Sequence, residues 1–154
     1  MIYKKIMLAI DGSVTSHFVV EEAIKLTKGQ DVSLRIIHVV DESYSYFGGS
    51  AFDALSYVAA CKKEGEKILH KAEKKITERS SIKVETSLVE LGPFQGRVGE
   101  VIVAEAKAWH ADLLIIGTHG RRGFSRLFLG SVADHIVQIA VMPVLLVRGS
   151  DASK

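Results

Sequence analysis

Short apolar runs alternate with longer amphipathic segments along most of this chain. The apolar runs predict five strands, at residues 6–10, 32–40, 84–91, 113–116 and 144–147. Apolar residues at helical spacing predict four helices, at residues 14–28, 52–79, 97–109 and 131–139. Strands that alternate with helices in this way indicate one α/β domain, with a parallel sheet, helices on both faces and right-handed crossovers.

Turn and capping residues fall at the boundaries of these elements. The first strand leads into Asp11 and Gly12, a turn that places Ser13 as the N-cap of the following helix. Gly29 stops that helix. The run at 113–116 is apolar without interruption, which is typical of a strand buried on both faces of a parallel sheet.

A loop rich in glycine and arginine follows this buried strand. Gly117 and Gly120 lie near its start, and Gly130 and Ser131 open the next helix. Glycines let backbone N–H groups approach a phosphate, and the start of a helix adds unpaired donors. Ser131 could cap the helix or donate to a phosphate oxygen. The arginines of the loop, at positions 121, 122 and 126, add positive charge. Taken alone, however, these residues favour a long, solvated basic turn, because glycine-rich loops are common.

The spacing of these residues resembles a family signature. Gly117-x2-Gly120-x9-Gly130-Ser131 is similar to the nucleotide-binding motif of the universal stress protein (UspA-like) family, in its ATP-binding branch. His119, Leu129 and residues 121–124 also resemble that family. The resemblance covers residues 1–148, leaving 149–154 as a tail expected to be disordered. It implies a Rossmann-like sheet of order 3-2-1-4-5, with the site at the carboxyl ends of strands one and four.

The resemblance also implies roles for single residues. Asp11 would lie beside the nucleotide. There its carboxylate could accept a hydrogen bond from a ribose hydroxyl or help hold a Mg²⁺ that bridges phosphates. The backbone of Val39 would read the adenine edge. Ala9 stands where some members have proline. The full set of expected nucleotide-binding positions is Ala9, Ile10, Asp11, Ser13, Val39, Ile116, Gly117, His119, Gly120, Arg121, Gly130, Ser131 and Val132.

The composition of the chain argues against several classes of protein. The chain has 154 residues, a formal net charge of +2 and one cysteine, Cys61, so neither a general nucleic-acid surface nor an internal disulfide is indicated. The first apolar run is too short for a signal peptide, and a cytoplasmic location is expected. Acidic residues interleave with the lysines of segment 52–79, which favours a solvated face with ion pairs over a nucleic-acid surface.

Other nucleotide and catalytic motifs are missing from the sequence. It has neither a P-loop nor a G-x-G-x-x-G in its first strand–helix turn. It lacks a G-x-S-x-G elbow, and its histidines show no metal-ligand spacing. Ser125 and Ser131 could accept a phosphoryl group, but no general base can be named beside either.

The leading hypothesis is a stress-response regulator that binds ATP, with or without Mg²⁺, and is not primarily an enzyme. By resemblance, it would form a homodimer through the last strand, residues 144–148, whose unpaired edge favours such pairing. Neither nucleic acid nor membrane is an expected partner. Three alternatives remain open: slow ATP hydrolysis or autophosphorylation, a dimeric interaction protein with an empty pocket, and a protein that binds AMP or cyclic AMP.

Overall fold

The computed structural model describes residues 2–43, 51–119 and 129–149. Its elements run in the order β1 (Lys5–Ala9), α1 (Val14–Thr27), β2 (Ser33–Asp41), α2 (Ala51–Thr77), β3 (Lys83–Leu91), α3 (Val98–Ala108), β4 (Leu113–Gly117), α4 (Ser131–Ile139) and β5 (Val144–Val147). The alternation predicted from the hydrophobic pattern is confirmed, with boundaries that differ by no more than two residues. Of the helices in the described part of the chain, none is long and apolar enough to span a membrane.

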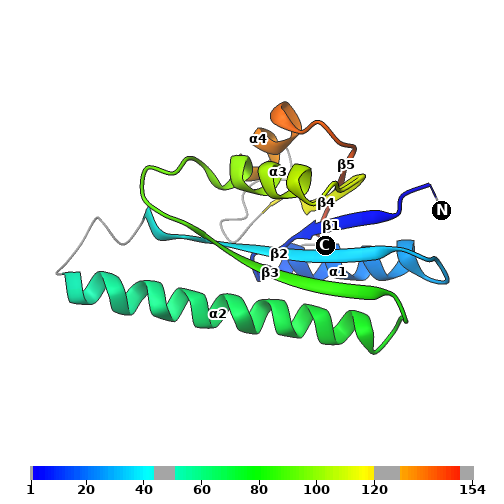
Figure 1. Cartoon of the computed structure of the whole chain (residues 1–154), viewed down its shortest axis with the longest axis horizontal. Coiled ribbons are helices and arrows are strands. Elements are labelled where there is room, and N and C mark those ends of the chain that lie inside the picture. The colour runs from blue at the N-terminus through cyan, green and yellow to red at the C-terminus, as the bar shows by residue number, and fades with distance from the viewer. Residues whose placement is uncertain (1, 44–50, 120–128, 150–154) are drawn as a thin grey trace, which may run out of the picture.

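The five strands form one parallel sheet of order β3-β2-β1-β4-β5, as the resemblance implied (Figure 1). The central strand β1 pairs with β2 on one side and β4 on the other, so that Ala9 lies opposite both Ile37 and Ile116. From β1 the chain winds outward first through β2 and β3, and later through β4 and β5. The gap between the carboxyl ends of β1 and β4 is therefore the topological switch point, where open α/β sheets bind ligands.

Alternate residues of the central strands supply two hydrophobic cores. Leu8 and Ile115 point to the face covered by α1 and α2, whereas Met7 and Ile116 point to the face covered by α3 and α4. The two pairs of helices lie on opposite sides of the sheet in Figure 1. All four residues from Leu113 to Ile116 are buried, as predicted for a strand covered on both faces.

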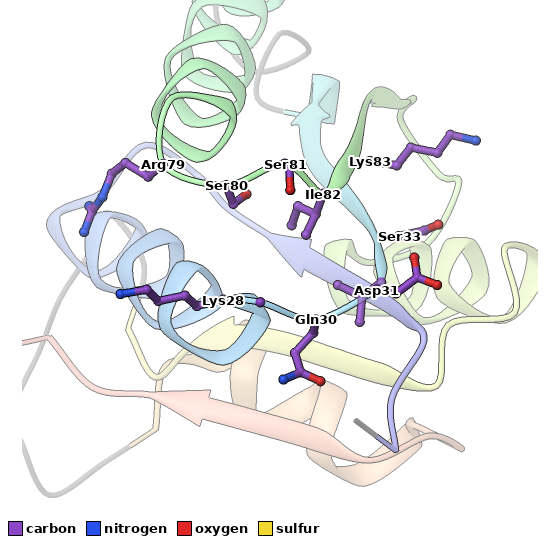
Figure 2. Close-up of a pocket in the computed structure, with 11 residues that line it drawn as sticks. Lys28, Gln30, Asp31, Ser33, Arg79, Ser80, Ser81, Ile82 and Lys83 are labelled. Atoms are coloured by element: carbon purple, nitrogen blue, oxygen red, sulfur yellow. The ribbon is translucent and has the colours of Figure 1, made fainter.

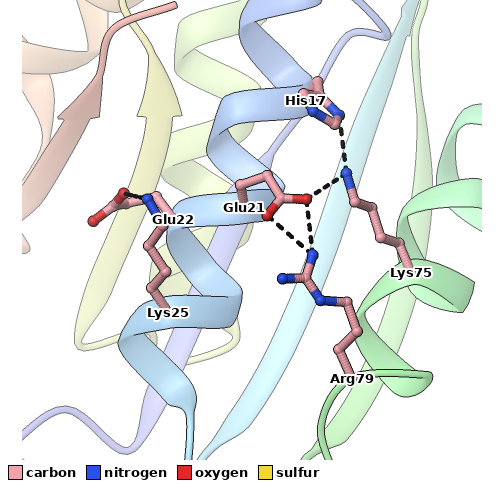
Figure 3. Close-up of polar contacts among 6 residues, drawn as sticks. All are labelled: His17, Glu21, Glu22, Lys25, Lys75 and Arg79. Carbon is pink, nitrogen blue, oxygen red and sulfur yellow. Dashed lines mark hydrogen bonds and ion pairs between the residues drawn. The ribbon is translucent and has the colours of Figure 1, made fainter.

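A polar network joins α1 to α2 on the first of these faces (Figure 3). The Glu21 carboxylate accepts from Arg79 Nη1 at 2.9 and 3.0 Å and forms an ion pair with Lys75 Nζ at 2.5 Å. Hydrogen bonding from Lys75, and then from Arg79, lowers the pKa of Glu21 to about 2. Lys75 Nζ also donates to His17 Nδ1 at 2.9 Å, so that nitrogen must be unprotonated.

Candidate functional site

The turn after β1 is held in a fixed shape by its own side chains. Asp11 Oδ1 accepts from the Ser13 N–H at 3.0 Å and from Ser16 Oγ at 2.8 Å. Ser13 is the N-cap of α1, as predicted, and its hydroxyl accepts from the Ser16 N–H. Gly12 has a φ of 81°, which a glycine adopts without strain. Asp11 and Ser13 therefore lie at the carboxyl end of β1, beside the switch point.

The ladder between β1 and β2 ends at this turn. Its last backbone hydrogen bond runs from Ile10 N to Ile37 O, at 3.0 Å. In a parallel pair, alternate residues of a strand direct both N–H and C=O toward the same neighbour. Val39 therefore directs its backbone groups to the β1 side, as Ile37 does. Since β1 turns away after Ile10, these groups face the carboxyl end of the sheet next to the switch point.

The two ends of the glycine-rich segment after β4 are drawn together. The Thr118 N–H donates to the Val147 carbonyl at 2.9 Å, and the Thr118 carbonyl accepts from the Gly130 N–H at 2.7 Å. This second bond places the start of α4 beside the end of β4. His119 follows, with Nδ1 lying 3.1 Å from Thr118 Oγ1.

Close packing at the end of β4 requires a glycine. A Cβ atom at Gly117 would lie 2.5 Å from Thr15 Cγ2, in the first turn of α1. The absence of that atom lets β4 and α1 approach each other. Gly117 thus brings the carboxyl end of β4 close to the start of α1, at the edge of the switch point.

The start of α4 differs from one sequence prediction. Ser131 does not cap the helix: the N-cap is Gly130, and Ser131 is the first helical residue. As a glycine, this N-cap residue has no side chain to supply a capping hydrogen bond. The first N–H groups of any helix lack partners within that helix, and they carry the positive end of its dipole. The amides of Ser131 and Val132 are therefore suited to an anion.

The switch point collects residues from four segments that are separate in sequence, namely Ala9, Ile10, Asp11, Ser13, Val39, Ile116, Gly117, His119, Gly130, Ser131 and Val132. Gly120 and Arg121 lie outside the described residues, as do Arg122, Ser125 and Arg126. Among the described residues, no group of three histidine, cysteine or acidic side chains could hold a metal ion. A Mg²⁺ at Asp11 would therefore depend on ligands from phosphates, and it stays a prediction.

A hollow of about 850 Å³ lies at the opposite, amino-terminal end of β2 and β3 (Figure 2). Its basic side chains do not converge, because Lys83 points away from Lys28 and Arg79. Arg79 is already paired with Glu21. In addition, α1 and α2 end beside this hollow, and the carboxyl end of a helix disfavours anions. These features argue against a phosphate site there.

Fold and site together define an open α/β protein with the start of a helix at its switch point. The sequence profile described as the universal stress protein family matches residues 2–148. The chain is 35% identical to universal stress protein MJ0531 of Methanocaldococcus jannaschii over 148 residues, which are 96% of this chain and 83% of the relative. It is also 35% identical to universal stress protein A homolog 2 of Coxiella burnetii, over 95% of each chain. The protein belongs to the universal stress protein family.

Solved structures agree with this assignment at the level of the fold. The hypothetical protein MJ0577 superposes with a TM-score of 0.82 at 23% identity, covering 99% of this chain and all of that one. UspA of Lactobacillus plantarum superposes with a TM-score of 0.80 at 21% identity, covering 95% of this chain and 98% of that one. This chain therefore shares the fold of these two structures.

Proposed function

We propose that this protein binds an adenine nucleotide at the switch point and acts as a nucleotide-dependent regulator of the stress response. The observation that carries the proposal is the start of α4. Gly130 leaves the helix without a side-chain cap, and its N–H bond to Thr118 fixes the helix start beside β4. An uncapped helix N-terminus at a switch point is suited to a phosphate.

The other predicted residues fit distinct parts of such a ligand. The amides of Ser131 and Val132 would bind phosphate, with Gly120 and Arg121 completing the loop around it. Asp11 would bind the ribose and, with a triphosphate, help hold Mg²⁺. The backbone of Val39, which faces the end of the sheet, would bind the adenine.

Solved members of the family support an adenine nucleotide as the ligand class. One universal stress protein structure is a complex with cAMP, at 22% identity and a TM-score of 0.67. Another, from Archaeoglobus fulgidus, is a complex with dAMP, at 21% identity and a TM-score of 0.60. For this chain we propose ATP, because the arginines at 121, 122 and 126 supply charge for several phosphates, with AMP or cAMP as the alternative.

We also propose a homodimer that forms through the edge strand β5, at residues 144–148. An exposed apolar side chain lies close to this edge in sequence: Val141, three residues before β5, is 71% exposed. An open edge strand beside apolar surface favours pairing with a second copy. Nucleotide occupancy would then shift the conformation presented to a partner. A cytoplasmic location stays a prediction.

The first test is the nucleotide content of protein purified without added ligand, followed by titration with Mg·ATP, AMP and cAMP. Bound ATP, or saturable binding in the titration, would support the proposal. Release of phosphate or labelling of the protein from γ-labelled ATP would instead favour the enzyme alternative. The absence of binding to all three nucleotides would refute the proposal and favour an interaction protein with an empty pocket.

The site is tested by Gly130→Val, with Gln138→Val as the matched control on the same helix. The φ and ψ of Gly130, −60° and 155°, are open to a β-branched residue, so the fold should be kept. The new side chain would stand where a phosphate must approach, and nucleotide affinity should fall at least tenfold. Gln138 is exposed and distant in sequence from the helix start, so its variant should bind normally. Equal affinity for the two folded variants would show that this helix start is not the phosphate site.

A further inference from the structure

A buried histidine forms a hydrogen bond with the carbonyl group at which the ladder between β1 and β2 stops. His38 Nδ1 lies 2.8 Å from the Ile10 carbonyl oxygen, and the side chain is 8% exposed. Because a carbonyl oxygen only accepts, Nδ1 must carry the proton and donate. A buried carbonyl needs such a partner, and here a side chain 28 positions further along the chain provides it.

This contact replaces a backbone hydrogen bond of the sheet. If the ladder continued in register, the Val39 N–H would donate to the Ile10 carbonyl, just as Ser33 N donates to Lys4 O at 2.9 Å. Among the described residues, no backbone hydrogen bond joins Val39 to Ile10. His38 therefore satisfies the carbonyl that would otherwise take the amide of Val39.

Helix α2 is shaped to admit this imidazole. Gly65 lies in the middle of α2, where glycine is unfavourable by propensity. A Cβ atom at Gly65 would lie 2.7 Å from His38 Cδ2 and 2.7 Å from Leu88 Cδ1. A side chain at this position would push the ring, so the glycine preserves the contact between His38 and Ile10.

From these contacts we infer that His38 is a positioning residue for base recognition, which acts by keeping the Val39 backbone free to read adenine. This inference rests on the proposed function. Among the described residues, neither the N–H nor the C=O of Val39 is bonded to the backbone of β1. Such an N–H beside a C=O matches the Watson–Crick edge of adenine, which presents an acceptor at N1 and a donor at N6. Guanine presents the opposite pattern, with a donor at N1 and an acceptor at O6. The arrangement at Val39 would therefore select adenine over guanine.

The decisive comparison is between His38→Asn and His38→Leu. The two replacements are nearly the same size and leave the same space, but only asparagine keeps an N–H donor near the position of Nδ1. In His38→Leu the Ile10 carbonyl loses its partner, and the Val39 N–H is the donor that a continued ladder would supply to it. If this backbone hydrogen bond formed, the Val39 N–H would no longer be available to the ligand. We expect His38→Leu to bind ATP roughly tenfold more weakly, the effect of one lost hydrogen bond, and to lose its preference for ATP over GTP by a similar factor.

His38→Asn should keep both the affinity and the preference within about threefold, well below the effect of one lost hydrogen bond. A purely structural role for His38 would weaken ATP and GTP binding in both variants alike and leave their ratio unchanged. Such an unchanged ratio, with equal binding by the two variants, would overturn the inference.

Amide hydrogen exchange of nucleotide-free protein tests the geometry separately from binding. The Val39 N–H should exchange readily in the wild type and in His38→Asn, and it should become protected in His38→Leu. Equal protection in all three proteins would overturn the inference even if each binds ATP. Conversely, if the wild type binds no nucleotide, the proposed function fails, while the exchange comparison still shows whether His38 controls the Val39 amide.

Discussion

Replacing Glu21 by glutamine should destabilise the protein at neutral pH and have little effect in acid. The pKa of this carboxyl falls from 4.5 to about 2 on folding, first because of the hydrogen bond from Lys75 and next because of that from Arg79. One pKa unit is worth about 1.4 kcal/mol, so the full shift sets an upper limit of roughly 3 kcal/mol. The Glu21 side chain is 24% exposed, and exposed ion pairs yield less than 1 kcal/mol each. We therefore expect Glu21→Gln to cost about 1–2 kcal/mol.

The pH dependence follows from the direction of the shift. Because the folded pKa of Glu21 is the lower one, its contribution is fully present above pH 4.5 and is lost as the pH falls toward 2. The free energy of unfolding of wild type and variant should therefore converge across that window. Urea is the suitable denaturant, since guanidinium salts would screen the network.

Glu22→Gln is the matched control on the same helix. Glu22 pairs only loosely with Lys25, at 3.5 Å, and is 43% exposed (Figure 3). Its replacement should change the free energy of unfolding by less than about 0.5 kcal/mol at any pH. Equal stability of the two variants at pH 7, or a gap that persists at pH 2, would refute this account of the network.

Two further predictions concern the packing of the site and the edge of the sheet. Gly117→Ala should destabilise the fold by about 1–3 kcal/mol, because its Cβ would press on Thr15 Cγ2. Thr15→Ser should recover part of this loss in a double-mutant cycle measured by urea unfolding. If the effects of the two substitutions simply add, this contact is not the cause. Val141→Lys should shift a dimer toward monomer in light scattering, whereas Leu55→Lys, on the similarly exposed surface of α2, should not; a dimer unaffected by Val141→Lys would exclude that edge as the interface.

Most of the architecture could be predicted from sequence because the apolar runs are long and uninterrupted. Residues 113–116 needed only their pattern to be placed in the centre of a sheet, and Ser13 only its position after a turn to be placed as a cap. Strand order was different: it depends on contacts between distant segments, and resemblance to a family supplied it.

The errors and omissions are tertiary in origin. Ile10 was expected in the first strand, but β1 ends at Ala9. Ile10 still donates its N–H to Ile37, whereas its carbonyl is bonded to His38. Ser131 resembles an N-cap in sequence, yet the N-cap is Gly130, whose N–H donates to the Thr118 carbonyl, and Ser131 is the first helical residue. The one available signal for His38 was Gly65, a glycine in the middle of an otherwise strong helix pattern.

The lysine-rich helix forms ion pairs, as predicted, but most of its partners lie on other elements. Lys74 of α2 does pair with Glu78, one residue past the end of the helix, at 3.9 Å. The shorter pairs leave the helix, since Lys62 reaches Glu90 of β3 and Lys75 reaches Glu21 of α1. Sequence spacing reveals pairs within one helix, whereas pairs between elements depend on how those elements pack.

Helix α2 is longer than the sheet that supports it. Its 27 residues span about 40 Å, whereas the nine residues of β3 span about 30 Å. Among the side chains of α2 that the structure describes, the buried apolar ones are Leu69, Ala72 and Ile76, and all three lie in its second half. The amino-terminal turns therefore carry little of the cooperative stability of the domain and should open first in native-state exchange. Such fraying would begin beside the carboxyl edge of the sheet, so this end of the molecule could change shape while the core stays folded.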